Sequence, residues 1–277
     1  MKIISDINSI GIQKVMDLYQ SSFDDPPSFC NAFFNSYFNP KKDFYFGVVD
    51  NNYLVMNCFF LEKRVRFNNQ NLKGYLIYGV SVDPNYQHQK IMTTNLLKFI
   101  NQMQLNSQLI FIQANDWNIY KHIDFKSCFE INYYALKKDQ FLKPIEVDHK
   151  INYDKINWIY NQFIKVNKIK NFYYKTSKEN KKYLKLHQLV NAKIMCLNNS
   201  YLIYWEDEKE IIEYAYLNLK DFIYLVSLLP LDTKIRSYIE LDKRFFKSTQ
   251  KNAIITKVYN SKFLNNENQS IFSNDIW

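Results

Sequence analysis

Three strand-like runs divided by asparagine-rich turns are the feature that most constrains how this chain can fold. The runs cover Phe44 to Val49, Tyr53 to Phe67 and Lys73 to Val82. The segments Asp50-Asn51-Asn52 and Asn68-Asn69-Gln70-Asn71 separate them. Asparagine tolerates the positive φ angles that tight hairpins require. The pattern therefore predicts a three-stranded meander.

Helical patterns flank this meander in the sequence. Apolar residues of Ile12 to Tyr19 share one helical face before Pro26-Pro27, and Phe29 to Tyr37 indicates a second short helix. The segments after the meander are a helix over Met92 to Met103, a strand over Leu109 to Gln113, a short helix over Trp117 to His122 and a strand over Phe129 to Leu136. This order predicts an α/β (α+β) layout around a mixed sheet, and neither a helix bundle nor a sandwich.

The polar stretch from Lys137 to His149 contains Pro144 and is a reasonable linker, after which the pattern restarts. The later segments are amphipathic Tyr153 to Val166, basic Lys178 to Leu189, a hairpin of Lys193 to Leu197 and Tyr201 to Trp205, alternating Glu210 to Leu217, apolar Phe222 to Leu229, and strand-like Ile235 to Leu241 and Ala253 to Tyr259. The second half thus repeats the α/β character of the first. The Asn- and Ser-rich residues from Asn265 to Trp277 predict a loose tail.

Composition excludes several classes of protein. A chain of 277 residues with 47% hydrophobic and 17% aromatic residues can bury a sizeable core, which argues against disorder and favours two domains. The longest apolar run, Phe222 to Leu229, ends at Pro230 and is too short to cross a bilayer. Charge precedes any apolar segment at the N-terminus, so no signal peptide is expected and the cytoplasm is the predicted compartment.

The net charge of +9 comes almost wholly from lysine, because the only arginines are Arg64, Arg66, Arg236 and Arg244. Arginine is the residue that makes bidentate hydrogen bonds to phosphate and guanine. Because the chain has so few arginines, nucleic acid is not an expected partner. Attraction for small anionic molecules remains a fair inference. The four cysteines form no Cys-x-x-Cys pair and only four histidines accompany them, so no metal site is expected.

The stretch from Tyr78 to Thr93 is the most informative about chemistry. It reads Tyr-Gly-Val-Ser-Val-Asp-Pro-Asn-Tyr-Gln-His-Gln-Lys-Ile-Met-Thr, so that a strand ends at Val82, a turn with Pro84 follows, and a helix opens near Lys90. Free amides at a helix N-terminus and the positive end of its dipole form a natural cradle for pyrophosphate.

This layout resembles motif A of the GNAT superfamily of N-acetyltransferases, whose loop reads Arg/Gln-x-x-Gly-x-Gly/Ala. Gln87 takes the first position, while Lys90 and Met92 stand where that loop has glycines. One branch is the Eis-like (enhanced intracellular survival) acetyltransferases. In its low-GC bacterial members the corresponding segment is similar to Tyr-Gly-Val-x-x-x-Pro-x-Tyr-Arg-x-x-Gly-Ile-Met-Thr. Tyr78 to Thr93 follows that pattern apart from Gln87 and Lys90.

Further segments carry the same resemblance. Ile119 to Phe125 is similar to the family's Tyr-x-x-x-Gly-Phe segment, with Asp124 in place of the glycine. The remaining similar segments are Leu18-Tyr19, Phe23 to Pro26 and Phe29 to Phe34 in the first half, and Tyr201 to Tyr204, Glu213-Tyr214 and Ala253 to Val258 in the second.

The resemblance implies two tandem GNAT-like domains at residues 1–140 and 151–262, each a mixed, largely antiparallel sheet flanked by helices, with a flexible tail at residues 263–277. The family also has a third, sterol-carrier-like domain, for which the residues up to Trp277 are too few. In characterised members that domain supplies the C-terminal carboxylate implicated as the base, so no base is assigned here.

The resemblance also implies roles for individual residues. Tyr120 would protonate the leaving thiolate, and backbone groups of the strand residues Val80, Ser81 and Val82 would hold the pantetheine arm of acetyl-CoA and the oxyanion. The pyrophosphate would be wrapped by Gln87, His88, Gln89, Lys90, Ile91, Met92 and Thr93. An alternative stays open for each of two residues. Tyr120 is one of 22 tyrosines and could be a packing residue, and the Lys90 side chain could point to water instead of to a phosphate.

Two functions are compatible with these residues. The first is an acetyl-CoA-dependent N-acetyltransferase that acts on a primary amine of a small molecule or a lysine side chain by direct attack. The second is a non-catalytic relative that binds acyl-CoA or another protein. Lys90 and Asp124 favour the second, whereas Gln87, the Val-x-Val strand and Tyr120 favour the first. The resemblance further implies a trimer-based homo-oligomer, and no membrane partner is expected.

Overall fold

The computed structural model describes residues 1–67, 70–105, 107, 109–114, 117–123, 125–140, 151–169 and 172–259. The predictions for Asp124, for the linker beyond residue 140 and for the tail lie outside these residues. The chain forms two compact units. The first consists of Met1–Val65, Asn71–Cys128 and a segment that starts at Ile255, and the second consists mainly of Phe129–Ile254.

The first unit is a mixed sheet with strand order β1-β2-β3-β4-β5-β12. Its strands are β1 (Lys2–Ile4), β2 (Phe44–Asp50), β3 (Tyr53–Phe67), β4 (Gln70–Val82), β5 (Leu109–Gln113) and the end of β12 (Phe246–Tyr259). The pairs β1–β2, β2–β3 and β5–β12 are antiparallel, whereas β4 and β5 are parallel. The predicted strands and the mixed sheet are therefore confirmed.

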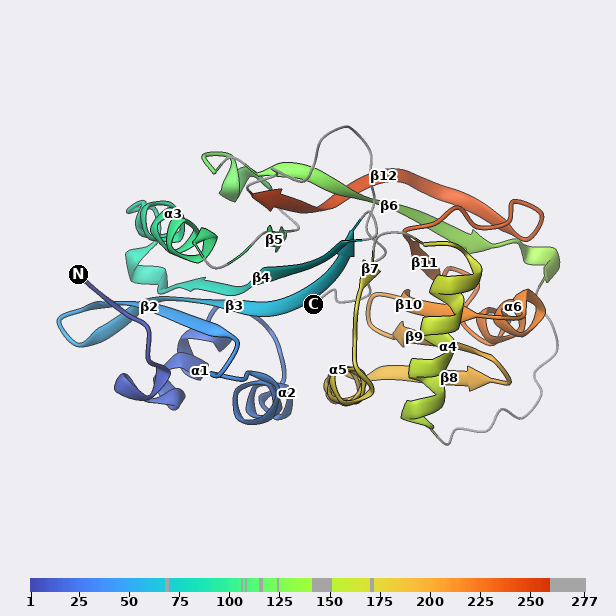
Figure 1. Ribbon diagram of the computed structural model, residues 1–277, viewed down its shortest axis with the longest axis horizontal. Coiled ribbons are helices and arrows are strands. Elements are labelled where there is room, and N and C mark those ends of the chain that lie inside the picture. Colours follow the sequence, from blue (N-terminus) through green and yellow to red (C-terminus); the bar gives the residue numbers. More distant parts are fainter. Residues whose placement is uncertain are drawn as a thin grey trace. The chain divides into compact units, whose positions relative to one another are not determined.

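Local chemistry explains the β2–β3 hairpin and the helices around this sheet. Asn51 and Asn52 both have positive φ, which is the backbone of a tight two-residue hairpin. The helices are α1 (Ile12–Gln20), α2 (Pro27–Ala32), the π-helical η2 (Phe33–Tyr37), α3 (Ile91–Gln104) and the 3₁₀ turns η1 (Ile7–Ser9), η3 (Pro84–Tyr86) and η4 (Trp117–Tyr120). Figure 1 shows α1 and α2 on one face of β2, β3 and β4, and α3 on the other.

The second unit has strand order β12-β6-β11-β10-β9-β8. Its elements are β6 (Lys126–Leu136), η5 (Lys138–Gln140), α4 (Tyr153–Val166), β7 (Phe172–Tyr173), α5 (Ser177–Leu189), β8 (Ala192–Leu197), β9 (Ser200–Trp205), β10 (Glu210–Tyr216), α6 (Leu219–Ser227) and β11 (Lys234–Ser237). The strand predicted over Ile235 to Leu241 ends early, at Ser237, where the Ser237 hydroxyl bonds the backbone of Ile239 and turns the chain.

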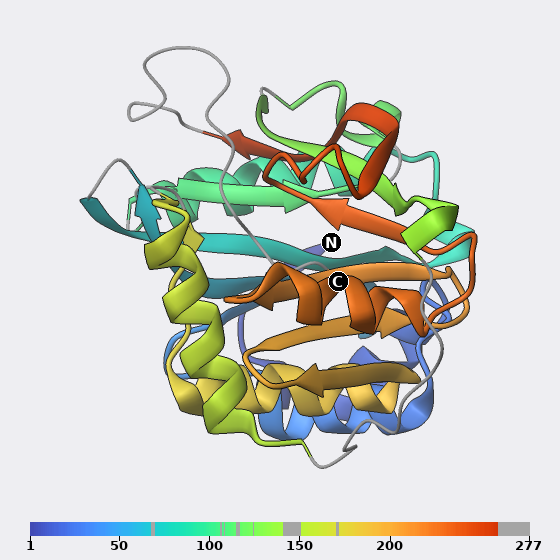
Figure 2. The ribbon, with the colours of Figure 1, turned by 90° about the vertical axis from the view of Figure 1, so that its right-hand side faces the viewer.

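Each unit contains one pair of parallel strands joined by a crossover helix. In the first unit α3 connects β4 to β5, and in the second α6 connects β10 to β11. Figure 2 shows α6 lying across β8, β9 and β10. The two units thus share one α/β arrangement, a mixed sheet with helices against it, as the sequence predicts.

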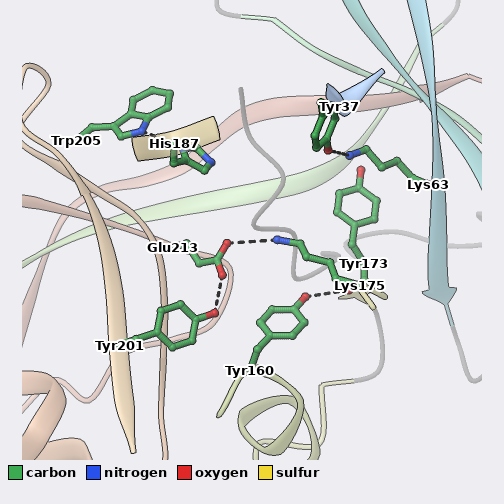
Figure 3. Close-up of polar contacts among 9 residues, drawn as sticks. All are labelled: Tyr37, Lys63, Tyr160, Tyr173, Lys175, His187, Tyr201, Trp205 and Glu213. Carbon is green, nitrogen blue, oxygen red and sulfur yellow. Dashed lines mark hydrogen bonds and ion pairs between the residues drawn. The ribbon is translucent and has the colours of Figure 1, made fainter. Parts of the chain in front are cut away.

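A buried ion pair lies in the core of the second unit. Lys175 Nζ is 3.3 Å from Glu213 Oε2, and the Tyr201 hydroxyl donates to Glu213 Oε1 at 2.5 Å (Figure 3). Lys175 Nζ also lies 3.7 Å from the ring centre of Tyr183 and 5.5 Å from that of Tyr160. The carboxylate and the aromatic faces together offset the cost of removing both charges from water.

Two expected absences can be compared with the described part of the chain. Within it, no helix combines the length and apolarity needed to cross a membrane. No three or more His, Cys, Asp or Glu side chains of these residues come together in a way that could hold a metal ion.

Candidate functional site

The parallel strands β4 and β5 separate at the point where the predicted site begins. Their register runs from Gly74 opposite Leu109 to Ile77 opposite Ile112, and β4 then continues to Val82 without a partner in this register. The Asp83 amide donates to Val55 O on β3 at 2.9 Å, so the backbone of Asp83 faces β3. Successive residues of a strand point their N–H and C=O groups to opposite edges, so the backbone groups of Val82 face the edge away from β3. The polar backbone of Val80 and Val82 is thereby directed into the gap between β4 and β5.

The side chains of the same strand divide between its two faces. Val80 and Val82 pack against the apolar cluster beneath α3, together with Met92 and Tyr120. Ser81 is buried, and its hydroxyl lies 3.4 Å from the Gly79 carbonyl oxygen. The alternation that turns Val80 and Val82 towards the gap turns the backbone groups of Ser81 towards β3, so of the three predicted strand residues only the two valines direct backbone groups into the gap.

The loop after β4 is exposed from Gln87 to Lys90 but is held by polar contacts at its start. Asp83 Oδ1 accepts from the Asn85 amide at 2.9 Å and caps η3. The Gln87 side-chain amide donates to Val82 O at 3.3 Å, and that of Gln89 donates to Asn85 O at 3.1 Å. The loop therefore returns to the strand end before the helix begins.

Helix α3 begins directly after a left-handed residue. Lys90 has φ 59° and ψ 14°, and His88 also has a positive φ of 60°. Glycine adopts this conformation without strain, which explains why a glycine stands at the Lys90 position in the similar motif. The exposed Lys90 side chain does not cap the helix, and no acidic residue lies in the first turn of α3. The first amides, of Ile91, Met92 and Thr93, are suited to an anionic group.

Tyr120, the predicted acid, is the last residue of η4 and packs half-buried against the same apolar cluster as Val80 and Val82. Burial, with a smaller contribution from the nearby Cys58 thiol, raises the pKa of Tyr120 to about 12. A phenol in this state keeps its proton near neutral pH and is therefore present as a proton donor. His122, two residues on, is exposed.

A hydrogen-bonded trio on the opposite face of β4 was not predicted. The Tyr19 hydroxyl donates to Asp25 Oδ2 at 2.5 Å and lies 2.6 Å from the Tyr78 hydroxyl. Burial raises the pKa of Asp25 above its ordinary value, although the hydrogen bond from Tyr19 acts in the opposite sense. The pKa values of both tyrosines are also raised, chiefly by burial, so both stay protonated. The trio therefore joins a carboxylate to Tyr78, the first residue beyond the paired part of β4.

Gly79 allows this trio to form. It has a φ of 59°, and a Cβ at this position would lie 2.9 Å from Cε2 of Tyr19 and 3.2 Å from Cδ2 of Phe59. The backbone here must approach the Tyr19 ring more closely than any side chain permits. Gly79 in the motif was the available signal, but the partners Tyr19 and Asp25 lie about 60 residues earlier in the sequence.

The features now described, a parallel pair that separates before an uncapped helix, define a class of fold, and the comparisons agree with it. Residues 4–128 match the family model described as "Acetyltransferase (GNAT) domain", and almost all of these residues belong to the first unit. Among curated proteins none matches the sequence.

Solved structures share the fold across most of the chain. They include a conserved protein of unknown function from Enterococcus faecalis V583, with a TM-score of 0.67 and 11% identity over 93% of this chain and 71% of that one. A GCN5-related N-acetyltransferase from Kribbella flavida has a TM-score of 0.67 and 10% identity over 93% and 70%. Eis1 from Mycobacterium abscessus has a TM-score of 0.64 and 10% identity over 93% and 73%. At such low identity the likeness shows the fold alone.

Proposed function

We propose that this chain is an acetyl-CoA-dependent N-acetyltransferase that transfers an acetyl group to a primary amine by direct attack. The observation that carries the proposal is that β4 separates from β5 before Val80 and Val82 and is followed along the chain by the uncapped start of α3. Such a gap offers backbone groups to an extended amide-bearing arm, although the Val82 carbonyl already accepts from Gln87, and the helix start offers amides to phosphates. The proposal concerns the first unit, where the family model also matches.

The second unit contains a similar crossover, but its chemistry argues against a second acetyl-CoA site. The Asn218 side chain caps α6 by accepting from the Lys220 amide, and Asp221 places a negative charge in the first turn. Between the parallel strands, the Tyr214 and Ser237 hydroxyls lie 2.5 Å apart and join β10 to β11. A helix start that is capped and acidic disfavours an anion, so α3 is the better pyrophosphate site.

Acetyl-CoA would supply the activated acyl group as a thioester. The backbone groups of Val80 and Val82 would bind its pantetheine arm, and the amides from Ile91 to Thr93 would bind its pyrophosphate. The residue that fits least well is Lys90, whose Cβ replaces the hydrogen of a glycine next to the phosphates. Its ammonium group can partly offset that loss by attraction to the same phosphates.

The proton of the attacking amine would leave through the trio on the other face of β4. As the amine attacks, Tyr78 accepts its proton and passes its own to Tyr19, which passes its proton to Asp25. Each phenol stays neutral, and the negative charge moves from Asp25 to the intermediate. The raised pKa of Asp25 makes it a stronger base than an exposed aspartate. The trio thus provides a base from within the first unit.

The remaining steps use the α3 side of the sheet. The carbonyl oxygen that becomes negative would accept from backbone N–H groups near Val82. When the carbon–sulfur bond breaks, Tyr120 would donate its proton to the departing CoA thiolate; Asp25 would then release its proton to solvent, and Tyr120 would regain one from solvent. We propose as partners a small amine or a lysine side chain, neither nucleic acid nor membrane, and association into a trimer-based oligomer.

Calorimetry with acetyl-CoA, and with CoA and ATP as controls, tests the cofactor part of the proposal. Micromolar acetyl-CoA binding with much weaker ATP binding is expected, and release of free CoA thiol in the presence of amines would then identify acceptors. Binding without thiol release from any primary amine would favour the non-catalytic reading. The absence of binding at millimolar acetyl-CoA would contradict the proposal.

A further inference from the structure

The β2–β3 hairpin is joined to the loop before α3 by two crossed hydrogen bonds. The Tyr53 hydroxyl, from the hairpin, donates to Asp83 Oδ2 in the loop at 2.6 Å. The Tyr86 hydroxyl, from the loop, donates to Asp50 Oδ2 in the hairpin at 3.3 Å. The two tyrosine rings stack with their centres 6.3 Å apart and their planes 25° apart. The hairpin and the loop therefore each contribute one tyrosine as donor and one carboxylate as acceptor.

Both contacts act on residues that lead into the proposed phosphate cradle. Asp83 is buried, follows the last residue of β4 and caps η3 through the Asn85 amide. The Tyr86 ring packs against the same apolar cluster as Val82 and Met92, which lie at the two ends of the loop. Fixing Asp83 and Tyr86 therefore fixes where the chain leaves the strand and where it can enter α3.

Packing alone does not hold this loop. Gln87, His88, Gln89 and Lys90 are all exposed, and His88 and Lys90 adopt the left-handed conformation that is costly for residues with a side chain. A strained, exposed segment keeps one conformation only where neighbouring contacts determine it. Tyr53 is 53% exposed, so its ring buries little surface beyond its contact with Tyr86, and its hydroxyl adds the hydrogen bond to Asp83.

We infer that Tyr53 and Tyr86 are positioning residues for the pyrophosphate of acetyl-CoA, which makes the β2–β3 hairpin part of the cofactor site. This inference rests on the proposed acetyl-CoA site. The two residues act through Asp83, Asp50 and the loop, without touching the cofactor. They pre-organise the loop, so the binding energy of the phosphates is not used to order it.

The test compares Tyr53→Phe and Tyr86→Phe with the wild-type chain for two donors, acetyl-CoA and S-acetylpantetheine, which lacks the pyrophosphate. Loss of one hydrogen bond to a carboxylate should weaken acetyl-CoA binding about tenfold in Tyr53→Phe. The longer Tyr86 bond should give a smaller loss. Binding of S-acetylpantetheine, followed by NMR titration, should stay within about twofold, because the strand backbone would still receive it.

Two controls separate positioning from general damage. Tyr153→Phe removes a similar exposed hydrogen bond, the 3.0 Å contact to Gln188 in the second unit, and should leave both affinities unchanged. Asp83→Asn keeps one of the two acceptor oxygens that Tyr53 and the Asn85 amide use, so it should lose part of the binding, whereas Asp83→Ala removes both and should lose more. Urea unfolding of each variant checks that the first unit remains folded.

The outcomes distinguish the inference from the proposed function. If the wild-type chain binds acetyl-CoA and Tyr53→Phe binds it equally well, the inference is wrong and the proposed function stands. Equal losses for both donors would also contradict it, because they would indicate a general structural role. If the wild-type chain binds neither donor, both proposals are wrong.

Discussion

Replacing Lys90 with glycine should both stabilise the first unit and tighten acetyl-CoA binding. Lys90 has φ 59° and ψ 14°, a left-handed conformation that costs about 1–2 kcal/mol for a residue with a Cβ. Glycine removes that cost but gives the unfolded chain more freedom, worth about 0.5–1 kcal/mol. The net gain in the free energy of unfolding should be about 0.5–1 kcal/mol.

The effect on acetyl-CoA has two opposing parts. Loss of an exposed ammonium removes an attraction of about 0.2–1 kcal/mol for the phosphates. Removal of the Cβ lets the amides after it approach those phosphates, and a hydrogen bond to a charged group is worth about 1.5–3 kcal/mol. The second part is the larger by about 0.5–2.8 kcal/mol, so affinity should rise roughly two- to hundredfold.

Calorimetry and urea unfolding of Lys90→Gly measure these two changes, with Lys90→Ala and Lys168→Gly as matched controls. Lys90→Ala removes the charge but keeps the Cβ, so it should bind no better than wild type. Lys168, in the second unit, has φ 51° and is exposed, so glycine there should stabilise its own unit without changing affinity. Equal losses of affinity in Lys90→Gly and Lys90→Ala would refute the reasoning and identify the Lys90 ammonium as a phosphate ligand.

Four further predictions follow from particular contacts. Tyr120→Phe should lower kcat about a hundredfold or more in a thiol-release assay, and unchanged turnover would exclude Tyr120 as the acid. Because the pKa of Tyr120 is about 12, ionisation of its hydroxyl should not cause any fall in wild-type activity near pH 9. Asp25→Asn should abolish most activity yet raise the free energy of unfolding at pH 7, because a carboxyl whose pKa is raised in the folded state destabilises that state above its pKa. A lower free energy of unfolding for Asp25→Asn in urea would contradict this prediction. Gly79→Ala should cost roughly 1–3 kcal/mol of unfolding free energy, since its Cβ would meet the Tyr19 ring, and full retention of stability and activity would show that the ring can move aside. Lys175→Met should cost roughly 3–5 kcal/mol by leaving Glu213 buried without its cation, and the double variant with Glu213→Gln should recover much of that loss; additive losses would argue against a coupled pair.

The strands and helices of the chain were largely predictable, because each is encoded by residues close in sequence. The hairpin at Asn51 and Asn52 follows from their tolerance of positive φ, and β3 covers the predicted residues Tyr53–Phe67. The turn from Val82 through Pro84 to the start of α3 follows from the same kind of local signal. Turn chemistry and periodicity act within one element, so a single sequence reveals them.

The side-chain networks could not be predicted by these means. A lysine in a basic chain is expected at the surface, yet Lys175 is buried because Glu213, 38 residues away, lies opposite it in the fold. Likewise, the pairing of Thr256 with Gln113 joins strands far apart in sequence. No local pattern states which distant element supplies the partner.

The candidate site shows how the two kinds of information combine. Its cofactor half, from Val80 to Thr93, is one continuous segment, so sequence alone could propose it. The half that we propose accepts the proton depends on Tyr78 meeting Tyr19 and Asp25 across the face of the sheet, and Gly79 permits that meeting through its positive φ. A carboxylate in a short polar run before α2 is an ordinary loop residue in the sequence. The phenol that reaches it from α1 is what makes Asp25 a candidate base for an amine at the gap between β4 and β5.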